Sequence, residues 1–466
     1  MADIVFERAA PSPATVTTAL AGTRHAVFWT EDAPGERAEK LEGTVDADLV
    51  IVGGGYTGLW TALRATDRDP SLRVVILEAD TIGWAASGRN GGFVEASLTH
   101  GEENGKRRWP EELDRLDELG AENLDAIEAA VKAHEMKADF ERTGTLTVAI
   151  EPHQLEWIEG PSTDDSVYLD ETAVRAAVNS PTYLAGRWDK AGTALVHPAK
   201  LANELARVAR ERGVRIFEHS RVRALTDDGV QTAAGQVRAR QTVLATNVFH
   251  SLLKRNRLMT VPVYDYVLMT EPLSAAQSKD IGWEDHQGLA DMANQFHYYR
   301  RTADDRILFG GYDAVYHYGR RVNPEYENRP SSYERLASHF FTTFPQLEGL
   351  QFSHRWAGAI DTSTRFCAFY GTARKGRVAY AAGFTGLGVG ATRFAADVML
   401  DLLSGEKTER TELRMVRERP LPFPPEPAAA MGINATRWSL NQADHREGKR
   451  NILLKALDAV GLGFDS

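Results

Sequence analysis

The chain has few of the features that mark secreted, metal-binding or membrane proteins. Its 466 residues include a single cysteine, Cys367, which excludes an internal disulfide and a cysteine-based metal cluster. No run of roughly 18 apolar residues occurs, so we expect no transmembrane helix and no membrane partner. The N-terminus lacks the basic start and the long apolar core of a secretory signal. We therefore expect a cytoplasmic location and no metal site.

The chain also lacks an excess of positive charge. The 54 Lys and Arg residues are outnumbered by 65 Asp and Glu residues, which gives a formal net charge of −11. Because nucleic-acid binding requires a basic surface to neutralise phosphates, we expect no nucleic-acid partner. A hydrophobic content of 43% is that of a globular protein, and the length predicts two or three domains.

A strand–helix–strand pattern follows an N-terminal extension over residues 1–46. Leu49–Val52 is a short apolar run typical of a strand buried on both faces. A glycine-rich turn and a helical stripe follow it, and Arg73–Leu77 predicts the second strand. Related patterns recur over 197–222 and 377–405, while residues 256–354 alternate polar and aromatic residues, as an antiparallel sheet does.

Three glycines in the first turn form the dinucleotide fingerprint Gly53-x-Gly55-x-x-Gly58, placed between a strand and a helix. Gly53 permits the tight turn, Gly55 lets the backbone approach a diphosphate, and Gly58 lets the helix pack closely on the strand. The diphosphate would then bind at the N-terminus of the helix, beside Tyr56 and Thr57.

An acidic residue ends the second predicted strand, where a carboxylate binds the ribose hydroxyls of a dinucleotide. Glu78, followed by Ala79, lies twenty residues after Gly58, the spacing that this role requires. The chain contains one fingerprint, whereas an enzyme that reduces flavin with NAD(P)H usually needs a second nucleotide fold. We therefore predict a flavin dinucleotide that takes its electrons from an organic substrate.

Several segments, in the same order, resemble the D-amino-acid oxidase family of FAD enzymes. That family includes glycine, sarcosine and γ-glutamylputrescine oxidases, and the last branch is the most similar here. The matching segments cover most of residues 45–405: ADLVIVGGGYTGL (47–59), ILEADTIGWAASGRNGG (76–92), TALVHPAKLANEL (193–205), TVLATN (242–247), RRTADDRILFGG (300–311), RWAGAI (355–360) and VAYAAGFTGLGVG (378–390).

The resemblance implies a particular division of the chain. We predict an α/β protein with a discontinuous Rossmann-like FAD-binding domain and an inserted α+β substrate domain built on an antiparallel sheet. The FAD-binding domain is expected over 47–105, 190–255 and 355–405, the substrate domain over 106–189 and 256–354, and a C-terminal helical tail over 406–466.

The resemblance also implies FAD as cofactor and oxidation of a substrate C–H bond next to nitrogen. Val222 matches the position whose backbone meets the adenine. Some relatives attach the flavin through a cysteine, but Cys367 lies in an apolar run a few residues beyond that position. We interpret Cys367 as a core residue and expect the FAD to be bound noncovalently.

Two glycine-rich segments are predicted to contact the flavin. In GWAASGRNGGF (83–93), Ser87 would meet the diphosphate, Gly91 and Gly92 would let the backbone lie against the ring, and Arg89 and Asn90 would face flavin or substrate. In GFTGLGVG (383–390), glycines let the backbone reach the ring, and backbone amides there stabilise developing negative charge. The residues expected at the ring from this second segment are Gly386, Leu387 and Gly388.

The substrate signals favour an amine. Gly390 occupies the position where sarcosine oxidases carry a lysine that clamps the substrate carboxylate, and Glu95 and His100 stand where arginines would be expected. Glu95 could hold an ammonium group, or it could be a surface acid. These departures count against a simple α-amino acid.

Aromatic side chains of the inserted sheet are the other candidates for the substrate site. Arg89, His317, Tyr264 and Tyr299 are the candidate catalytic residues, with Tyr266 and Tyr298 as further candidate walls of the pocket. Trp356 is expected near the flavin or in the core. No catalytic base is required if the amine binds in its neutral form.

We therefore predict an FAD-dependent amine oxidase that forms an imine and passes electrons to O2, giving H2O2. The segment 306–313 lacks the lysine that assists oxygen reduction in sarcosine oxidases, so a dehydrogenase with another acceptor is an alternative. Two further alternatives are an enzyme acting on D- or N-methyl amino acids and a non-catalytic flavin-bearing assembly or sensor protein.

Overall fold

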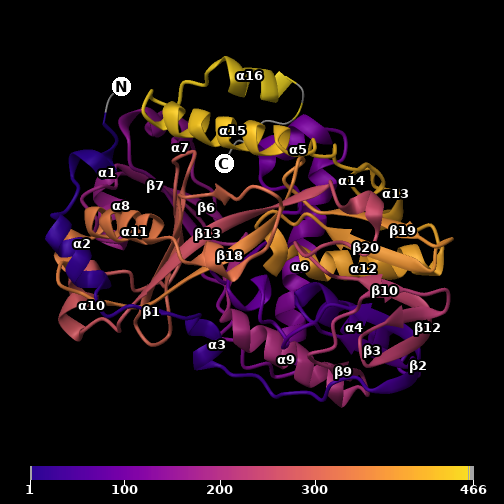
Figure 1. Cartoon of the computed structure of the whole chain (residues 1–466). Helices are drawn as coiled ribbons and strands as arrows, with labels where there is room; N and C mark the ends of the chain where they lie inside the picture. Colours follow the sequence, from indigo (N-terminus) through magenta and orange to yellow (C-terminus); the bar gives the residue numbers. More distant parts are fainter. Residues whose placement is uncertain (1–2, 460, 462–466) are drawn as a thin grey trace.

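One of the two large sheets of the protein is built around the strand that precedes the fingerprint. The computed structural model describes residues 3–459 and 461, and its two sheets lie side by side (Figure 1). In the first sheet, β2 (Gly43–Val52) pairs in parallel with β12 (Gly235–Leu244) and β3 (Val74–Leu77). The remaining strands of this sheet are β9 (Arg215–Phe217), β10 (Ala224–Leu225), β11 (Gly229–Gln231), β19 (Phe369–Ala373) and β20 (Val378–Ala382).

Both faces of the first sheet are buried, which explains why β2 ends in a continuous apolar run. Leu49 and Ile51 pack in the core formed with the helices, while Val50 and Val52 pack in a second core on the opposite face. The helices of the first core are α4 (Tyr56–Arg68), α6 (Leu113–Ala133), α9 (Pro198–Glu211) and α12 (Ala391–Ser404).

The second sheet is mostly antiparallel, as the alternating aromatic pattern predicts. Its long central pair is β13 (Thr260–Thr270) against β18 (Phe352–Ser363). Two pairings, β14 with β5 and β1 with β18, are parallel. The other strands are β1 (Arg24–His25), β5 (Thr145–Ala149), β6 (Ser166–Leu169), β7 (Ala185–Asp189), β14 (Gly288–Asp291), β15 (His297–Arg301), β16 (Ile307–Gly311) and β17 (Val315–Tyr316).

Three segments belong elsewhere than the predicted domain boundaries place them. Residues 355–363 are part of β18 in the second sheet, because this strand pairs with β13 over its whole length. Helix α6 packs its apolar stripe in the core of the first sheet, although it lies within 106–189. The extension 1–46 forms α1 (Val5–Arg8), α2 (Pro13–Leu20) and α3 (Phe28–Asp32), and Phe6 and Val16 pack in the core of the second sheet.

The remaining elements are short, except for α11 (Pro330–Thr343) and α15 (Ala428–Asp444). Helices α15 and α16 run along one side of the molecule, at the top of Figure 1. Among the described residues, none of the helices combines the length and the apolarity that a bilayer span requires. The other elements are η1 (Ala86–Gly88), β4 (Phe93–Glu95), α5 (Glu102–Arg108), η2 (Pro152–Gln154), α7 (Leu155–Ile158), α8 (Glu171–Ala177), β8 (Thr193–Leu195), η3 (Lys254–Asn256), α10 (Ala275–Ile281), η4 (Pro324–Glu327), α11 (Pro330–Thr343), η5 (Pro345–Leu347), η6 (Leu387–Val389), α13 (Glu409–Glu412), α14 (Arg414–Arg417), α15 (Ala428–Asp444) and α16 (Ile452–Ala459).

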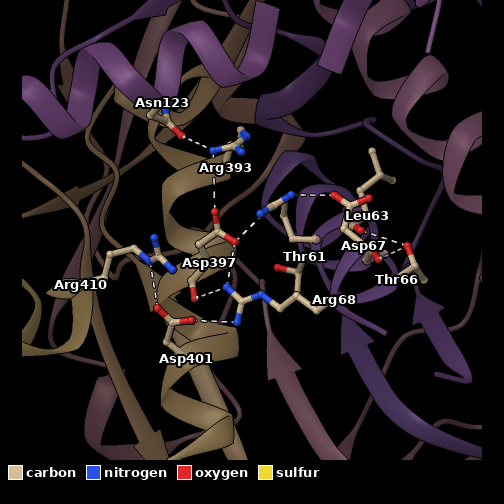
Figure 2. A network of polar contacts seen from close by, with 12 residues as sticks. Thr61, Leu63, Thr66, Asp67, Arg68, Asn123, Arg393, Asp397, Asp401 and Arg410 are labelled. Atoms are coloured by element: carbon tan, nitrogen blue, oxygen red, sulfur yellow. Dashed lines mark hydrogen bonds and ion pairs between the residues drawn. The ribbon is translucent and has the colours of Figure 1, made fainter. Parts of the chain in front are cut away.

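A network of ion pairs joins α4 to α12, the two helices that begin at the glycine-rich turns (Figure 2). Asp397 on α12 accepts hydrogen bonds from Arg64 Nε at 3.0 Å and Arg68 Nη2 at 2.9 Å, both on α4. One turn further along α12, Asp401 accepts from Arg68 at 2.8 Å and from Arg410 at 2.9 Å. The network therefore holds the two helices in one relative position.

Candidate cofactor and substrate site

A cavity of about 890 Å³ is lined by the carboxyl ends of strands in the first sheet and by residues of β13 and β18. Its lining includes most of the residues predicted to bind a dinucleotide. These are Gly53, Gly55, Tyr56, Thr57, Glu78, Ala79, Ser87, Asn90, Val222, Gly386 and Gly388.

A Cβ at each fingerprint glycine would approach a neighbouring atom closely, a backbone oxygen at Gly53 and Gly58 and a side-chain oxygen at Gly55. Gly53 has a φ of +117°, and a Cβ there would lie 2.3 Å from Ala245 O. A Cβ on Gly55 would lie 2.8 Å from Ser87 Oγ. Gly58 does not line the cavity; a Cβ there would lie 1.9 Å from Gly53 O, so this glycine lets α4 pack against the turn.

The Glu78 carboxylate is held at the end of β3 by three donors. Its Oε2 accepts from the backbone N–H of Gly54 at 2.7 Å. Its Oε1 accepts from the N–H of Asp80 at 2.9 Å and from Trp84 Nε1 at 2.8 Å. The acid is thus buried and fixed at the edge of the cavity, next to the fingerprint turn, where a ribose would bind.

The loop 83–93 folds over the start of α4 through its own polar side chains. Ser87 Oγ accepts from the backbone N–H of Tyr56 at 2.9 Å. The Asn90 side chain donates to Ala86 O at 2.9 Å and accepts from the N–H of Gly92 at 2.8 Å. Asn90 therefore stabilises the loop and also lines the cavity.

Arg89 points away from the cavity. Its Nε donates to Trp84 O at 2.9 Å, and its Nη1 lies 2.6 Å from the Glu327 carboxylate and 3.2 Å from Ala357 O. Glu327 belongs to η4 and Ala357 to β18, so Arg89 connects the loop with the second domain. Arg89 is absent from the cavity lining, and a contact of its guanidinium with flavin or substrate stays a prediction.

The two glycines that follow pack against protein atoms rather than lining the cavity. A Cβ on Gly91 would lie 2.6 Å from the ring of Tyr298, and one on Gly92 would lie 2.2 Å from Val196 O. Gly92 also has a φ of +81°. The small residues are needed because the loop is pressed between β15 and the segment that precedes α9.

The second glycine-rich segment follows the carboxyl end of β20 and lies at the same edge of the first sheet as the fingerprint turn. Gly386, with a φ of +95°, and Gly388 line the cavity, while Leu387 is buried in the core. A Cβ on Gly390 would lie 2.4 Å from Glu95 O, which leaves no room for a lysine at that position. Asn123 Nδ2 donates to Gly390 O at 3.0 Å and so fixes the start of α12.

The aromatic candidates for catalysis lie outside the cavity. Tyr264 and Tyr299 are fully buried in the core of the second sheet. Tyr264 donates to Asn323 O at 3.2 Å, and the Tyr299 hydroxyl lies 2.8 Å from that of Tyr183. Burial raises the pKa of both Tyr264 and Tyr299. His317 stacks on Tyr326 with ring centroids 3.9 Å apart and is also absent from the lining.

The other side chains considered for the substrate pocket have mainly packing roles. Tyr266 is a core residue. Tyr298 packs on Gly91 of the loop 83–93, and its hydroxyl donates to Asp265. Trp356 is buried and its Nε1 donates to Arg89 O at 2.8 Å. Glu95 and His100 do not line the cavity either.

The structure adds a buried acid that the sequence analysis missed. Asp361 on β18 lines the cavity, is 2% exposed, and accepts a hydrogen bond from the backbone N–H of Gly383. Its Oδ1 makes no hydrogen bond of normal geometry among the described residues, although the Thr260 side chain lies close enough to favour the ionised carboxylate. Burial raises the pKa of Asp361 to about 6. The signal in the sequence is an acid directly after the apolar segment RWAGAI.

The residues present fit a flavin dinucleotide. The fingerprint turn lines the cavity, the N-terminus of α4 faces it, and Glu78 is fixed beside the turn. The guanidiniums of Arg221, Arg320 and Arg321 add positive charge to the lining, which suits a diphosphate. A parallel sheet and an antiparallel sheet sharing such a cavity define the class of FAD-binding oxidoreductases.

The comparisons with known proteins identify the family. Residues 48–402 match the profile of the DAO family, described as FAD dependent oxidoreductase, and the chain belongs to this family. It is 31% identical over 388 residues to gamma-glutamylputrescine oxidoreductase of Escherichia coli (strain K12), covering 79% of this chain and 86% of that protein.

Solved structures share the fold at lower sequence identity. Glycine oxidase from Geobacillus kaustophilus superposes with a TM-score of 0.63 at 19% identity, over 78% of this chain and 96% of that chain. L-proline dehydrogenase from P. horikoshii superposes with a TM-score of 0.62 at 17% identity, over 80% and 96%. The protein is thus an FAD-dependent oxidoreductase of the DAO family.

Proposed function

We propose that the protein oxidises an amine at the carbon next to its nitrogen, and that O2 accepts the electrons from FAD. The observation that carries the proposal is Asp361, a buried carboxylate in the wall of the cavity, whose Oδ1 makes no hydrogen bond of normal geometry among the described residues. A buried carboxylate requires a compensating partner, and a substrate ammonium group would supply it. The similarity to gamma-glutamylputrescine oxidoreductase supports an amine as the substrate class.

The residues of this chain would bind the cofactor and orient the substrate. The backbone amides at the start of α4, with Ser87, would hold the diphosphate, and Glu78 would bind the ribose. FAD, when bound, supplies an acceptor for two electrons. Asp361 Oδ1 would accept a hydrogen bond from the substrate nitrogen and take its proton before the C–H bond is broken.

Cys367 supports noncovalent binding of FAD. This residue, the single cysteine of the chain, is fully buried in the core of the first sheet and does not line the cavity. Burial also raises the pKa of its thiol, which disfavours the reactive thiolate. Denaturation with acid should therefore release free FAD from the purified protein.

Anaerobic reduction of the bound flavin tests the proposal. The purified protein is mixed with diamines, acylated diamines, N-methyl amines and D-amino acids, and the absorbance of the flavin is followed. We expect bleaching by at least one amine and re-oxidation on admission of air. Colourless protein that binds no FAD, or flavin that no amine bleaches, would contradict the amine oxidoreductase. Bleaching without re-oxidation by air would assign a dehydrogenase instead.

A further inference from the structure

A second cavity, of about 530 Å³, shares no lining residue with the first. It is lined by residues of α1, α11 and α15 and by residues that follow β16, so the first helix of the chain and a C-terminal helix lie together there. Helix α15 can be followed at the top of Figure 1. The lining is rich in cationic and amide side chains: Ile4, Glu7, Gln295, Tyr312, Asp313, Arg329, Arg335, His339, Arg437, Trp438, Asn441, Gln442 and His445.

Three guanidinium groups converge on one carboxylate in this cavity. Asp313 is 3% exposed and lies 2.8 Å from Arg329, 3.2 Å from Arg437 and 3.4 Å from Arg335. Ser332 also donates to it at 2.6 Å. Burial opposes ionisation of Asp313, but Ser332 and the arginines outweigh it and hold the pKa below its usual range.

The arginines of the lining outnumber its carboxylates. The other acid of the lining, Glu7, lies 3.0 Å from His445. Asp313 is the carboxylate that contacts all three arginines, and the mutual repulsion of the arginines is unfavourable at this separation. The three arginine side chains are 35%, 44% and 32% exposed for Arg329, Arg335 and Arg437. A guanidinium has more N–H donors than these contacts use, so donors remain for a ligand.

The rest of the lining suits an organic molecule rather than a bare ion. Trp438 is 61% exposed at this cavity, and the amides of Asn441 and Gln442 lie beside it on α15. A volume of this size accommodates a small metabolite. An exposed indole offers a flat apolar surface to such a ligand.

A chain of buried hydrogen bonds leads from Asp291 through His297 to His339, which lines the same cavity. Asp291 lies 2.6 Å from His297 Nδ1, and His297 Nε2 lies 2.9 Å from His339 Nδ1. With Asp291 ionised, each histidine donates through Nδ1, which leaves His339 Nε2 as an acceptor. Burial lowers the pKa of His339 well below its usual range, so His339 remains neutral. It can thus accept a hydrogen bond from a hydroxyl or N–H group.

We propose that this cavity is a binding site for a small organic anion, held through a carboxylate or phosphate group by Arg329, Arg335 and Arg437. Planar guanidiniums bind both oxyanions in a two-pronged geometry. Trp438 and the α15 amides would contact the organic part. The site is independent of the function proposed above, because it shares no residue with the flavin cavity.

Calorimetric titration of the FAD-saturated enzyme tests the site, because bound FAD prevents anions from occupying the diphosphate position. The probes are inorganic phosphate and succinate, each titrated at constant ionic strength against sodium chloride as reference. We expect saturable binding of at least one probe. Phosphate alone would assign a phosphate ligand, and succinate alone a carboxylate.

Three variants locate the binding. Arg335→Gln and Arg437→Gln should each raise the dissociation constant of the bound probe by about tenfold or more. Arg446→Gln removes an exposed arginine just beyond α15, outside the cavity, and should leave it unchanged. Arg335→Gln should disturb the fold less than Arg437→Gln, because Arg335 lies at an ion-pair distance from Asp313 without a hydrogen bond. No saturable binding, or binding that neither Arg335→Gln nor Arg437→Gln weakens, would overturn the proposal.

Discussion

Arg89 of the loop 83–93 and Glu327 of η4 form an ion pair with 2.6 Å between Nη1 and Oε2. Both side chains are largely buried, at 18% and 19% exposure. The same guanidinium donates to Ala357 O on β18, so one side chain binds the loop to η4 and to a strand of the second sheet. Arg89 therefore positions the loop that covers the start of α4.

Replacing Arg89 by alanine should weaken FAD binding by about tenfold. Without its attachment the loop is less ordered in the free protein, so it loses more conformational entropy when FAD binds. Glu327→Gln should have a smaller effect in the same direction. In a double-mutant cycle the two changes should be coupled by about 1 to 2 kcal/mol. The measurement is the FAD dissociation constant, from the change in flavin fluorescence when FAD is titrated with the apoprotein.

The exposed pair of Lys449 and Glu447 provides the control, since Lys449→Ala should leave FAD binding unchanged. An Arg89→Ala effect that is fully additive with Glu327→Gln would instead indicate direct contact of Arg89 with the flavin. An unchanged dissociation constant in Arg89→Ala would contradict both roles.

Gly58→Ala should abolish or strongly reduce FAD content. The added Cβ would lie 1.9 Å from Gly53 O, so α4 must move away from the turn that binds the diphosphate. Overpacking of this kind costs about 3 kcal/mol. Gly432→Ala is the matched control, because a Cβ on that helical glycine would point into open space, with no neighbouring atom within 4 Å, and the variant should gain stability from the better helix former. Normal FAD content in Gly58→Ala would refute the packing argument.

The elements that could be predicted from sequence are those in which the backbone itself binds or packs. Gly58 is dictated by a local approach to Gly53 O, Gly53 has a positive φ of +117° in the turn itself, and the acid at Glu78 follows at a fixed spacing. Asn90 and Ser87 are likewise local, because their partners lie on the loop or on the adjacent helix.

The side chains that depend on tertiary contacts could not be predicted. Which face of β13 meets the cofactor domain depends on its register with β18, and that register turns Tyr264 into the core. The partner of Arg89 lies 238 residues away on η4. Asp361 follows an apolar segment, and its burial results from strand pairing that no local motif encodes.

The pH dependence of catalysis tests Asp361. Because burial raises the pKa of this acid to about 6, its carboxylate binds an ammonium group above that pH and loses it below. We expect kcat/KM for the amine substrate to rise with pH through about 6. Asp361→Asn should abolish this rise of kcat/KM, the acidic limb of the pH profile, and should raise KM by about two orders of magnitude.

Asp265→Asn is the matched control for that profile. Burial also raises the pKa of Asp265 to about 6, but this acid accepts from Tyr298 and does not line the cavity. The variant should therefore retain the limb near pH 6. Loss of the limb in Asp265→Asn together with its retention in Asp361→Asn would reverse the assignment.

The network between α4 and α12 should dominate the acid sensitivity of the fold. Burial opposes ionisation of Asp397, but the facing guanidiniums of Arg64 and Arg393 outweigh it and hold the pKa below its usual range. A lowered pKa means that the ionised acid stabilises the fold above its ordinary pKa, and that this contribution is lost as the pH falls through the folded-state value.

Asp397→Asn should lower the free energy of unfolding at pH 7 by about 3 to 5 kcal/mol, because Arg64, Arg68 and Arg393 lose their shared carboxylate. The variant should also lose less stability than the wild type between neutral and acidic pH. Urea unfolding across that range measures both effects, and Asp164→Asn, an exposed loop acid, should follow the wild type. A wild-type pH profile in Asp397→Asn would show that the two cofactor helices are held by apolar packing alone.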